Sequence, residues 1–571
     1  MPIVNIIEKD ISIEVKENTI LLDAIRLSGL NIETPCNSMG ICGKCKIIAI
    51  GSMSNPTDEE KKIINQNKHE RLSCMAKVIG DVEVYLNSNR GHLKTINKGQ
   101  SINLEIDIAV KTIQLPKLNR NECRSYIDSL NYDVSSINIY NKISNIEIFN
   151  SEKLCGVVYR NNLIDITVKK NRLYGVSIDI GTTGISYYLI DLKNGEIKKQ
   201  KSSLNPQTMY GGDVLSRITF CMENEDGVKK LQKLIVEDIN KSIFELVDDI
   251  HNIYHICIAG NTTMLHLLLG INPKSISKAP YKAVFLDINE LKASEIGIKA
   301  NDEAILDLIP CASSYVGGDI VSGILASGFQ NKNKALFVDI GTNGEIAAIV
   351  NDKIIATSTA AGPALEGMNI ECGCLARNGA IEVFDIDDKY NIRYRTIGNQ
   401  KAIGICGSGL IDIVSALFKR GILTKSGRWN KKLDVKIKHR FVDNKFYITE
   451  DIYISQKDVR QIQLAKGAIS TGIILLLKQI GIEIDDVESV YIAGAFGYHV
   501  NPESIKTIGL IPKGFNGNVE FLGNTSLEGA RLAIINRKFR SELKILSKSI
   551  EILELSLSPI FQEVFVKELS F

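Results

Sequence analysis

Hydrophobic and polar residues alternate in short runs at the start of the chain. Residues 3–15, IVNIIEKDISIEV, alternate on both sides of EKD, which predicts two strands joined by a hairpin turn. Residues 18–32 have a helical spacing, with Leu22, Ile25 and Leu27 expected near one face and Gly29 at the end. Residues 74–86 alternate again as strands. The pattern therefore predicts a small unit of strands and one helix.

Three cysteines of this unit lie on one short segment, CNSMGICGKC, between the expected helix and the next strand. Zinc sites usually combine two separated Cys-x2-Cys pairs, or one such pair with histidines. A [2Fe–2S] cluster instead takes three thiolates from one loop and a fourth from a distant position. The spacing Cys-x5-Cys-x2-Cys followed by a lone cysteine therefore predicts a [2Fe–2S] cluster bound by Cys36, Cys42, Cys45 and Cys74.

The order of these elements resembles that of the β-grasp [2Fe–2S] ferredoxins over residues 1–92. Gly40 and Gly43 would let the cysteine segment turn tightly around a cluster. The resemblance implies one-electron transfer. A zinc knuckle or four free thiols remain the alternatives for this segment.

Residues 93–172 carry weaker patterns. Alternation over 101–116 predicts a strand, residues 121–130 predict a helix, and residues 146–181 are rich in β-forming residues. We expect a linker followed by a small α+β domain, without a chemical motif.

The remaining part, residues 173–571, contains an internal repeat. GVSIDIGTTG at 175–184 and ALFVDIGTNG at 335–344 are each an apolar strand, an aspartate, a Gly-Thr turn and a second strand. HICIAGN, ending at Asn261, and VYIAGAFG, ending at Gly497, form a second pair of strand-and-turn units. This order predicts a duplicated domain with lobes of roughly 173–330 and 331–571.

The Asp-x-Gly-Thr turns are suited to binding phosphates. Glycine lets backbone N–H groups approach phosphate oxygens, and threonine adds hydroxyl donors. The aspartates at the strand ends, Asp179 and Asp339, can hold Mg²⁺ through water or orient a nucleophilic water. Tight connections in an ordinary α/β protein remain an alternative for these turns.

These motifs resemble those of the superfamily that contains actin, sugar kinases and heat-shock ATPases. The resemblance implies a ribonuclease-H-like fold that binds ATP between two lobes, with IAGAFG at 492–497 near adenosine. GICGSGLID at 404–412 begins a further helix, whose N-terminus could bind an anion. The predicted nucleotide-binding residues are Gly181, Thr182, Thr183, Asn261, Gly341, Thr342, Asn343, Gly344, Gly407, Ser408, Gly494, Ala495 and Phe496.

The composition of the chain limits its expected partners and its expected location in the cell. Among 571 residues, 44% are hydrophobic and 23% charged, and the net charge is +2, so neither nucleic acid nor an anionic membrane is an expected partner. The start of the chain lacks the pattern of a signal peptide, and the apolar run at 467–484 is too short to span a bilayer. We expect a soluble cytoplasmic protein with reduced thiols.

A ferredoxin followed by an actin-like ATPase, with AGNTTM, DIGTNGE, AAGPALEGM and YIAGAFG, resembles the reductive activators of corrinoid proteins along almost the whole chain. The resemblance implies an enzyme of anaerobic metabolism. It would use ATP and Mg²⁺ to return Co(II) to Co(I) for a methyltransferase system. It also implies two partners, a corrinoid protein and an upstream low-potential electron donor. The oligomeric state stays open, with a homodimer as one alternative.

Three other functions remain open at this stage. One is a small-molecule kinase with a redox-sensing ferredoxin domain. Another is an activator of a dehydratase-type enzyme, with a [4Fe–4S] cluster at a dimer interface that would recruit Cys372 and Cys374. The third is an electron-transfer adaptor with an inactive nucleotide fold. ATP turnover with and without a corrinoid protein would separate them.

Overall fold

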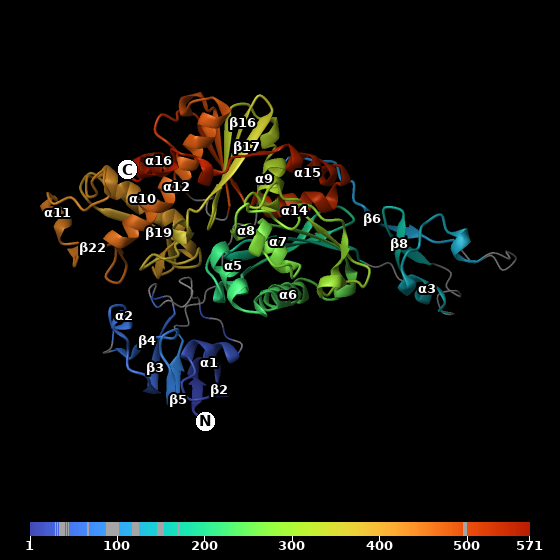
Figure 1. Ribbon diagram of the computed structural model, residues 1–571, viewed down its shortest axis with the longest axis horizontal. Helices are drawn as coiled ribbons and strands as arrows, with labels where there is room; N and C mark the ends of the chain where they lie inside the picture. Colours follow the sequence, from blue (N-terminus) through green and yellow to red (C-terminus); the bar gives the residue numbers. More distant parts are fainter. Residues whose placement is uncertain are drawn as a thin grey trace.

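The chain folds into a ferredoxin-like part, a small middle sheet and a body of two large sheets (Figure 1). In Figure 1 the ferredoxin-like part lies below the body, and the middle sheet extends to its right. This computed structural model describes residues 1–28, 30, 32, 40, 43, 45–65, 68–86, 102–116, 125–145, 154–167, 172–494 and 500–571.

The N-terminal part is a five-stranded sheet in the order β2-β1-β5-β3-β4. β1 pairs antiparallel with β2 and parallel with β5, and the predicted hairpin turns at Ile7–Lys9. Together with the helix that follows β2, this arrangement is the predicted β-grasp fold. Its elements are β1 Ile3–Ile6, β2 Ile11–Glu14, α1 Leu21–Leu27, β3 Lys46–Met53, α2 Asp58–Lys61, β4 Glu70–Leu72 and β5 Val78–Tyr85.

Helix α1 covers the apolar face of this sheet. Leu22 and Ile25 are buried, but Leu27 is 71% exposed, so the expectation that it shares their face was wrong. Five residues along an α-helix turn a side chain about 140° away from the first one. The expected helix terminator, Gly29, lies outside the described residues.

The middle sheet, in the order β6-β7-β8, packs against helix α3 around a small core of its own. The strand expected over 101–116 is shorter, because Ile102 and Asp107 donate backbone hydrogen bonds to Ala326 and Ile535 of the body instead. Of the expected helix at 121–130, the described residues form one 3-10 turn, Ile127–Ser129. The elements are β6 Val110–Gln114, α3 Ile137–Ile143, β7 Cys155–Tyr159 and β8 Asn162–Thr167.

The two large sheets have matching centres. In the first, the hairpin β9–β10 lies beside the parallel strand β12; in the second, the hairpin β15–β16 lies beside the parallel strand β24. This correspondence confirms the predicted duplicated, ribonuclease-H-like fold. The first sheet comprises β9 Tyr174–Ile180, β10 Gly184–Asp191, β11 Ile197–Leu204, β12 Ile253–Gly260, β13 Leu291–Lys292 and β14 Ile305–Leu308. The second comprises β15 Ala335–Ile340, β16 Gly344–Val350, β17 Lys353–Thr359, β24 Ser489–Ala493, β25 Asn518–Gly523 and β26 Glu551–Ile552.

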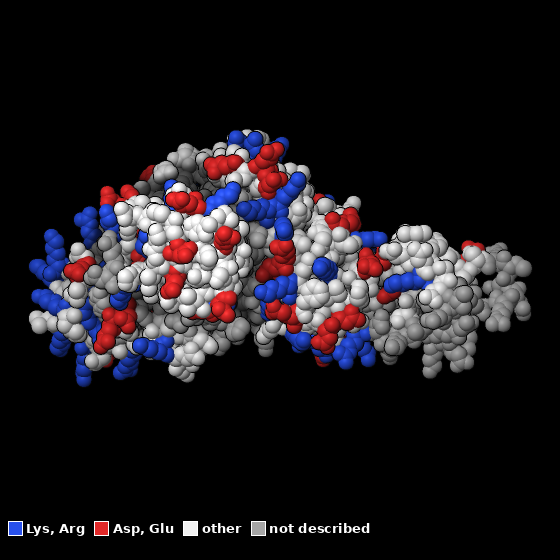
Figure 2. All heavy atoms as spheres, turned by 90° about the horizontal axis from the view of Figure 1, so that it is seen from below, with Lys and Arg blue, Asp and Glu red and all other residues white. Residues whose placement is uncertain are grey.

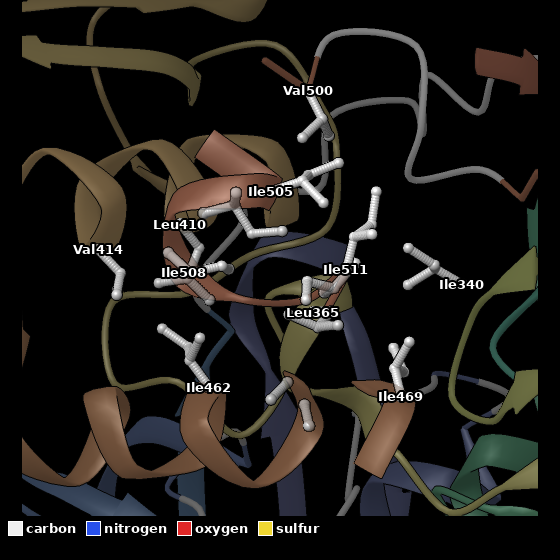
Figure 3. Close-up of a cluster of buried hydrophobic side chains, with 14 of the residues drawn as sticks. Ile340, Leu365, Leu410, Val414, Ile462, Ile469, Val500, Ile505, Ile508 and Ile511 are labelled. Carbon is white, nitrogen blue, oxygen red and sulfur yellow. The ribbon is translucent and has the colours of Figure 1, made fainter. Parts of the chain in front are cut away.

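One hydrophobic core joins the two sheets. It contains residues from both sheets together with α9 and α14. Figure 3 shows part of another core, in the second lobe, to which α10, α12 and α13 contribute. The helices of the body are α5 Val214–Glu223, α6 Gly227–Leu246, α7 Thr262–Leu268, α8 Lys274–Ser277, α9 Gly318–Ser327, α10 Gly407–Lys419, α11 Val435–Lys438, α12 Gln456–Ile480, α13 Pro502–Ile508, α14 Thr525–Ile535, α15 Arg537–Ser549 and α16 Phe561–Glu568.

The second lobe also contains two smaller three-stranded sheets, in the orders β19-β18-β20 and β21-β22-β23. Their strands are β18 Ala380–Ile386, β19 Ile392–Thr396, β20 Gly404–Ile405, β21 Phe441–Val442, β22 Lys445–Tyr447 and β23 Tyr453–Ser455. On the face shown in Figure 2, lysine and arginine gather at the left end, where Figure 1 places α11 and β22. No helix in the described part of the chain is long and apolar enough to cross a bilayer.

Candidate functional site

The ferredoxin-like part brings two of the four predicted cluster cysteines together. Cys45, just before β3, and Cys74, just after β4, are both buried, and their sulfur atoms lie 3.2 Å apart. A disulfide bond would need about 2.05 Å. Two thiolates on one tetrahedral metal at about 2.3 Å lie about 3.7 Å apart, so a small outward shift of the two sulfur atoms would let this pair hold one iron of a cluster. Cys36 and Cys42 lie outside the described residues.

The cysteine segment turns at Gly40 and Gly43, as the sequence predicts. Their φ angles are 72° and 69°, in the left-handed region that favours glycine. A Cβ atom on Gly40 would lie 2.8 Å from the Met75 sulfur, and one on Gly43 would lie 2.9 Å from the Ile63 side chain. Side chains at both positions would therefore be strained and crowded. Gly40 therefore lies close to Met75, the residue that follows Cys74.

A cavity of about 460 Å³ lies between the two lobes of the body, a size suited to a small ligand. Both copies of the repeat reach it, together with the N-terminus of α10 and the end of β24. Of the predicted residues, those that line the cavity are Asp179, Gly181, Thr182, Thr183, Asn261, Asp339, Gly341, Thr342, Asn343, Gly407, Ser408 and Gly494.

Gly344 is a predicted residue that does not line this cavity. It begins β16, and a Cβ atom there would lie 2.9 Å from Ile469 of α12, so the residue faces the core of the lobe. Ala495 and Phe496, which the sequence places near adenosine, lie outside the described residues.

The first phosphate loop, between β9 and β10, is braced on several sides. The Asn205 side chain donates to the Gly181 carbonyl at 2.9 Å, and the Asn261 side chain donates to the Thr182 hydroxyl at 3.2 Å. The Asp179 carboxylate accepts hydrogen bonds from Asn524 at 2.9 Å and Ser526 at 2.8 Å. The loop and its aspartate are therefore held by hydrogen bonds from neighbouring elements.

The second phosphate loop, between β15 and β16, touches the first. The Thr183 and Thr342 hydroxyl oxygens lie 3.1 Å apart, and both donate to one carboxylate oxygen of Glu366, at 2.9 Å and 3.2 Å. Glu366 belongs to AAGPALEGM, a motif whose individual residues have no predicted role. The two lobes thus meet at hydroxyl groups that can also bind phosphate oxygens.

Carboxyl groups crowd one side of the cavity. Burial, followed by the charges of Asp319 and Asp179, raises the pKa of Asp339 to about 8. Burial and the neighbouring Asp179 raise the pKa of Asp319 to about 7. Burial also raises the pKa of Glu345 well above its usual range and that of Glu366 to a smaller extent. None of the described residues that line the cavity is a lysine or an arginine.

This charge arrangement fits a magnesium ion delivered with a nucleotide. In the described residues, no three His, Cys, Asp or Glu side chains form a ready ligand set. Mg²⁺ usually keeps several waters and binds through one or two carboxylates plus the phosphates of its substrate. Asp179, Asp319 and Asp339 are the carboxylates that could contribute.

Sequence reasoning missed several residues that shape this site. Asp319 follows GG at the start of α9, but this helix begins ten residues after β14 and therefore lacks the direct strand–Gly–helix pattern of the other motifs. Asn524 and Ser526 lie at the start of α14, far from Asp179 in the sequence. Arg217 and Asn205 contact the loop only through its carbonyl groups, and their spacing carries no signal.

Cys372 and Cys374, the pair that a dehydratase-type activator would use, lie in the second lobe. Cys374 and Cys406 are buried in one small apolar cluster, and the Cys372 sulfur lies 3.9 Å from the Asp451 carbonyl oxygen. Cys406 also lines the cavity.

The ferredoxin-like part and both lobes of the body match known protein families. A family model described as a 2Fe-2S iron-sulfur cluster binding domain matches residues 4–78. The RACo middle region matches residues 174–332, and the C-terminal domain of RACo, the ASKHA domain, matches residues 333–571. The chain is therefore a [2Fe–2S] protein fused to an ATPase of the actin and heat-shock class.

Relatives cover the whole chain. The corrinoid activation enzyme RamQ of Eubacterium limosum is 31% identical, over 98% of this chain and 97% of its own. The [Co(II) methylated amine-specific corrinoid protein] reductase of Methanosarcina barkeri is 27% identical, over 70% of this chain and 77% of its own. A solved reductive activator for corrinoid, iron-sulfur protein is 30% identical with a TM-score of 0.76, over 100% and 98% of the two chains. This chain belongs to the family of reductive activators of corrinoid proteins.

Proposed function

We propose that this chain uses ATP to reduce the corrinoid cofactor of a partner protein from Co(II) to Co(I) for a methyltransferase system. One observation carries the proposal. The ferredoxin-type cysteines and the two-lobed nucleotide cavity occur on a single chain, which matches a corrinoid activation enzyme over 98% of its length.

The ferredoxin part delivers the electron. Cys36, Cys42, Cys45 and Cys74 hold a [2Fe–2S] cluster, which supplies one electron at a time. An upstream low-potential donor restores that electron after each transfer.

The nucleotide makes an unfavourable transfer possible. Each 100 mV opposed by one electron costs about 2.3 kcal/mol. A nucleotide bound with about micromolar affinity offers roughly 8 kcal/mol to divide between the states of the protein. A change in the angle of the two lobes would convert that binding energy into a change of affinity for the oxidised partner.

Different residues of the cavity bind the phosphates of ATP, orient water and bind Mg²⁺. Thr182, Thr183, Thr342 and Asn343 bind the phosphates, and the backbone at Gly181 and Gly341 allows their close approach. Asp339 orients the attacking water, because the described residues donate no hydrogen bond to its carboxylate and leave it free to accept one. Mg²⁺ neutralises the phosphates beside these carboxyl groups.

Further residues of the cavity suit the nucleoside. Gly407 and Ser408 begin α10, and Gly494 directly follows β24, at the start of the predicted adenosine loop. A Cβ atom on Gly494 would lie 2.6 Å from the Asp339 carboxylate, so glycine is required where this loop passes the second aspartate. Ala495 and Phe496 continue the loop in this proposal.

The test uses anaerobically purified protein with a reconstituted cluster, a Co(II) corrinoid protein and titanium(III) citrate as electron source. We expect Co(I) absorbance to appear with Mg-ATP and to stay absent with ATP plus EDTA. Reduction at the same rate without nucleotide would reject the coupling. Phosphate transfer from ATP to a metabolite, with no stimulation of ATP turnover by the corrinoid protein, would favour a small-molecule kinase instead.

Two finer proposals concern the setting. We place the reaction in the cytoplasm, where thiols stay reduced. Light scattering of the same preparation decides whether the active form is a homodimer.

A further inference from the structure

Arg217 is a buried cation behind the first phosphate loop. Its side chain is fully buried, and no carboxylate of the described residues forms an ion pair with it. Instead, its guanidinium donates to the Thr182 carbonyl, to the Gln207 side chain at 3.1 Å and to the Gly211 carbonyl at 3.0 Å. Breaking hydrogen bonds of a buried charge is expensive. Arg217 therefore holds the phosphate loop and the segment 205–211 together.

Further bonds strengthen this link. The Asn205 backbone N–H donates to the Thr183 carbonyl at 2.9 Å, and its side chain donates to the Gly181 carbonyl at the same distance. All three carbonyls from Gly181 to Thr183 are thus tied to Arg217 or to Asn205. A displacement of this loop must carry the segment 205–211 with it.

The far end of the same segment holds the ferredoxin domain. Arg26, near the end of α1, donates to the Met209 carbonyl at 2.5 Å, and its guanidinium carbon lies 5.2 Å from the centre of the Tyr210 ring. Lys230 approaches the same ring at 4.5 Å, and Phe220 packs against it with ring centres 4.7 Å apart. A cation over an aromatic ring is attracted by the negative face of the ring, so these contacts favour the docked position of the ferredoxin domain.

The contact between the two phosphate loops indicates how nucleotide binding would affect the ferredoxin domain. Thr183 and Thr342 lie 3.1 Å apart and both donate to one oxygen of Glu366, so a phosphate group bound by both hydroxyl groups must take the place of that carboxylate. The negative charge of Glu366 also repels a phosphate at this point. The rearrangement that admits the phosphate shifts the backbone at 181–183, and the bonds described above transmit the shift to Met209 and Tyr210.

We propose that nucleotide binding loosens the contact between Arg26 and the Met209–Tyr210 segment, and so releases the ferredoxin domain from the first lobe. This inference rests on the proposed function. It makes Arg26 a positioning residue for the electron donor, although Arg26 does not line the nucleotide cavity. Coupling between two binding events is reciprocal, so weakening the Arg26 contact must tighten ATP binding by the same factor.

The central experiment measures the ATP dissociation constant of Arg26→Ala by calorimetry, on full-length protein with an intact cluster spectrum. We expect binding about 5-fold tighter than in the wild type, at the lower end of typical couplings. Lys16→Ala, a loss of an exposed cation on the same domain, is the matched control and should leave the constant unchanged. Unchanged or weaker ATP binding in Arg26→Ala would overturn the inference.

A second variant tests the contact from its other side. Tyr210→Leu keeps the backbone but removes the ring that faces Arg26. It should tighten ATP binding by a smaller factor than Arg26→Ala, because the hydrogen bond from Arg26 to the Met209 carbonyl remains, and the double variant should bind no more tightly than Arg26→Ala alone. Additive effects would contradict a shared contact.

A third variant tests transmission through the buried arginine. In an Arg217→Lys background, Arg26→Ala should change ATP affinity by less than about 2-fold, because lysine cannot keep the three-way connection. An undiminished effect would overturn this route, and thermal melting confirms that the variant is folded.

ATP-dependent Co(I) formation by the wild type distinguishes a failure of this inference from a failure of the proposed function. If it occurs while Arg26→Ala binds ATP normally, only this inference fails; if the wild type ignores ATP, both fail.

Discussion

The two copies of the repeated hairpin have the same backbone but different surroundings. At the first copy, Asp179 accepts hydrogen bonds from Asn524 and Ser526, which hold its carboxylate in place. At the second, the described residues donate no hydrogen bond to the carboxylate of Asp339, and burial raises its pKa to about 8. The neighbouring elements therefore place the two aspartates in different surroundings. The first carboxylate is held by two hydrogen bonds, and the second receives none from the described residues.

The largest effect is expected for Asp339→Asn, which tests whether the second aspartate is needed for ATP turnover. We expect ATP turnover to fall by about 10²–10³-fold, the usual effect of losing a group that orients the nucleophile or stabilises the transition state. The visible spectrum of the cluster should stay unchanged, because the substitution lies in the other domain. Steady-state ATPase assays and absorbance on one sample check both. A turnover close to that of the wild type would show that Asp339 has no such task.

Asp179→Asn should have a smaller effect on turnover, about 10-fold. An amide can keep only part of the hydrogen bonding with Asn524 and Ser526, so we also expect a loss of about 1–2 kcal/mol in the free energy of unfolding. Urea denaturation beside the ATPase assay measures both quantities. Equal losses of turnover in Asp179→Asn and Asp339→Asn would remove the distinction between the two copies.

Cys45→Ser tests whether the cluster site and the nucleotide site work independently. Replacing this thiol should abolish the [2Fe–2S] absorbance and Co(I) formation, while ATP turnover without a corrinoid protein changes by less than about 2-fold, because Cys45 does not line the nucleotide cavity. Iron and sulfide analysis with an ATPase assay checks this. Loss of both activities would mean that the two sites do not work as separate modules.

Lys466→Met provides a control for effects of stability alone. Lys466 lies on α12, where burial lowers its pKa to about 8. The unfolded chain holds this proton up to about pH 10.4, so the charged lysine opposes folding at neutral pH, and wild-type stability should rise by about 2 kcal/mol from pH 7 to 10. Lys466→Met should lack this rise, while its ATP turnover at neutral pH stays near normal. Denaturation at several pH values measures the difference between the two proteins.

The chemistry that lies in local spacing could be predicted from the sequence. The Asp-x-Gly-Thr turns and the cysteine spacing each place donor groups within a few residues, and backbone geometry alone then brings them together. Asp319, Glu366 and Arg217 could not be identified in this way, because folding brings them to the loops from other elements. Leu27 shows the limit of periodicity, since a rotation of one residue decides between core and solvent.

The pairing of Asp179 with Asn524 has a consequence for biosynthesis. These residues are 345 positions apart. At a translation rate of about 5–20 residues per second, the ribosome needs about 20–70 s to make the stretch between them. Residues 1–86 have left the ribosome long before the braces of the first phosphate loop emerge. The nascent chain can thus form its ferredoxin sheet, and receive its iron, well before it has a finished pocket for ATP.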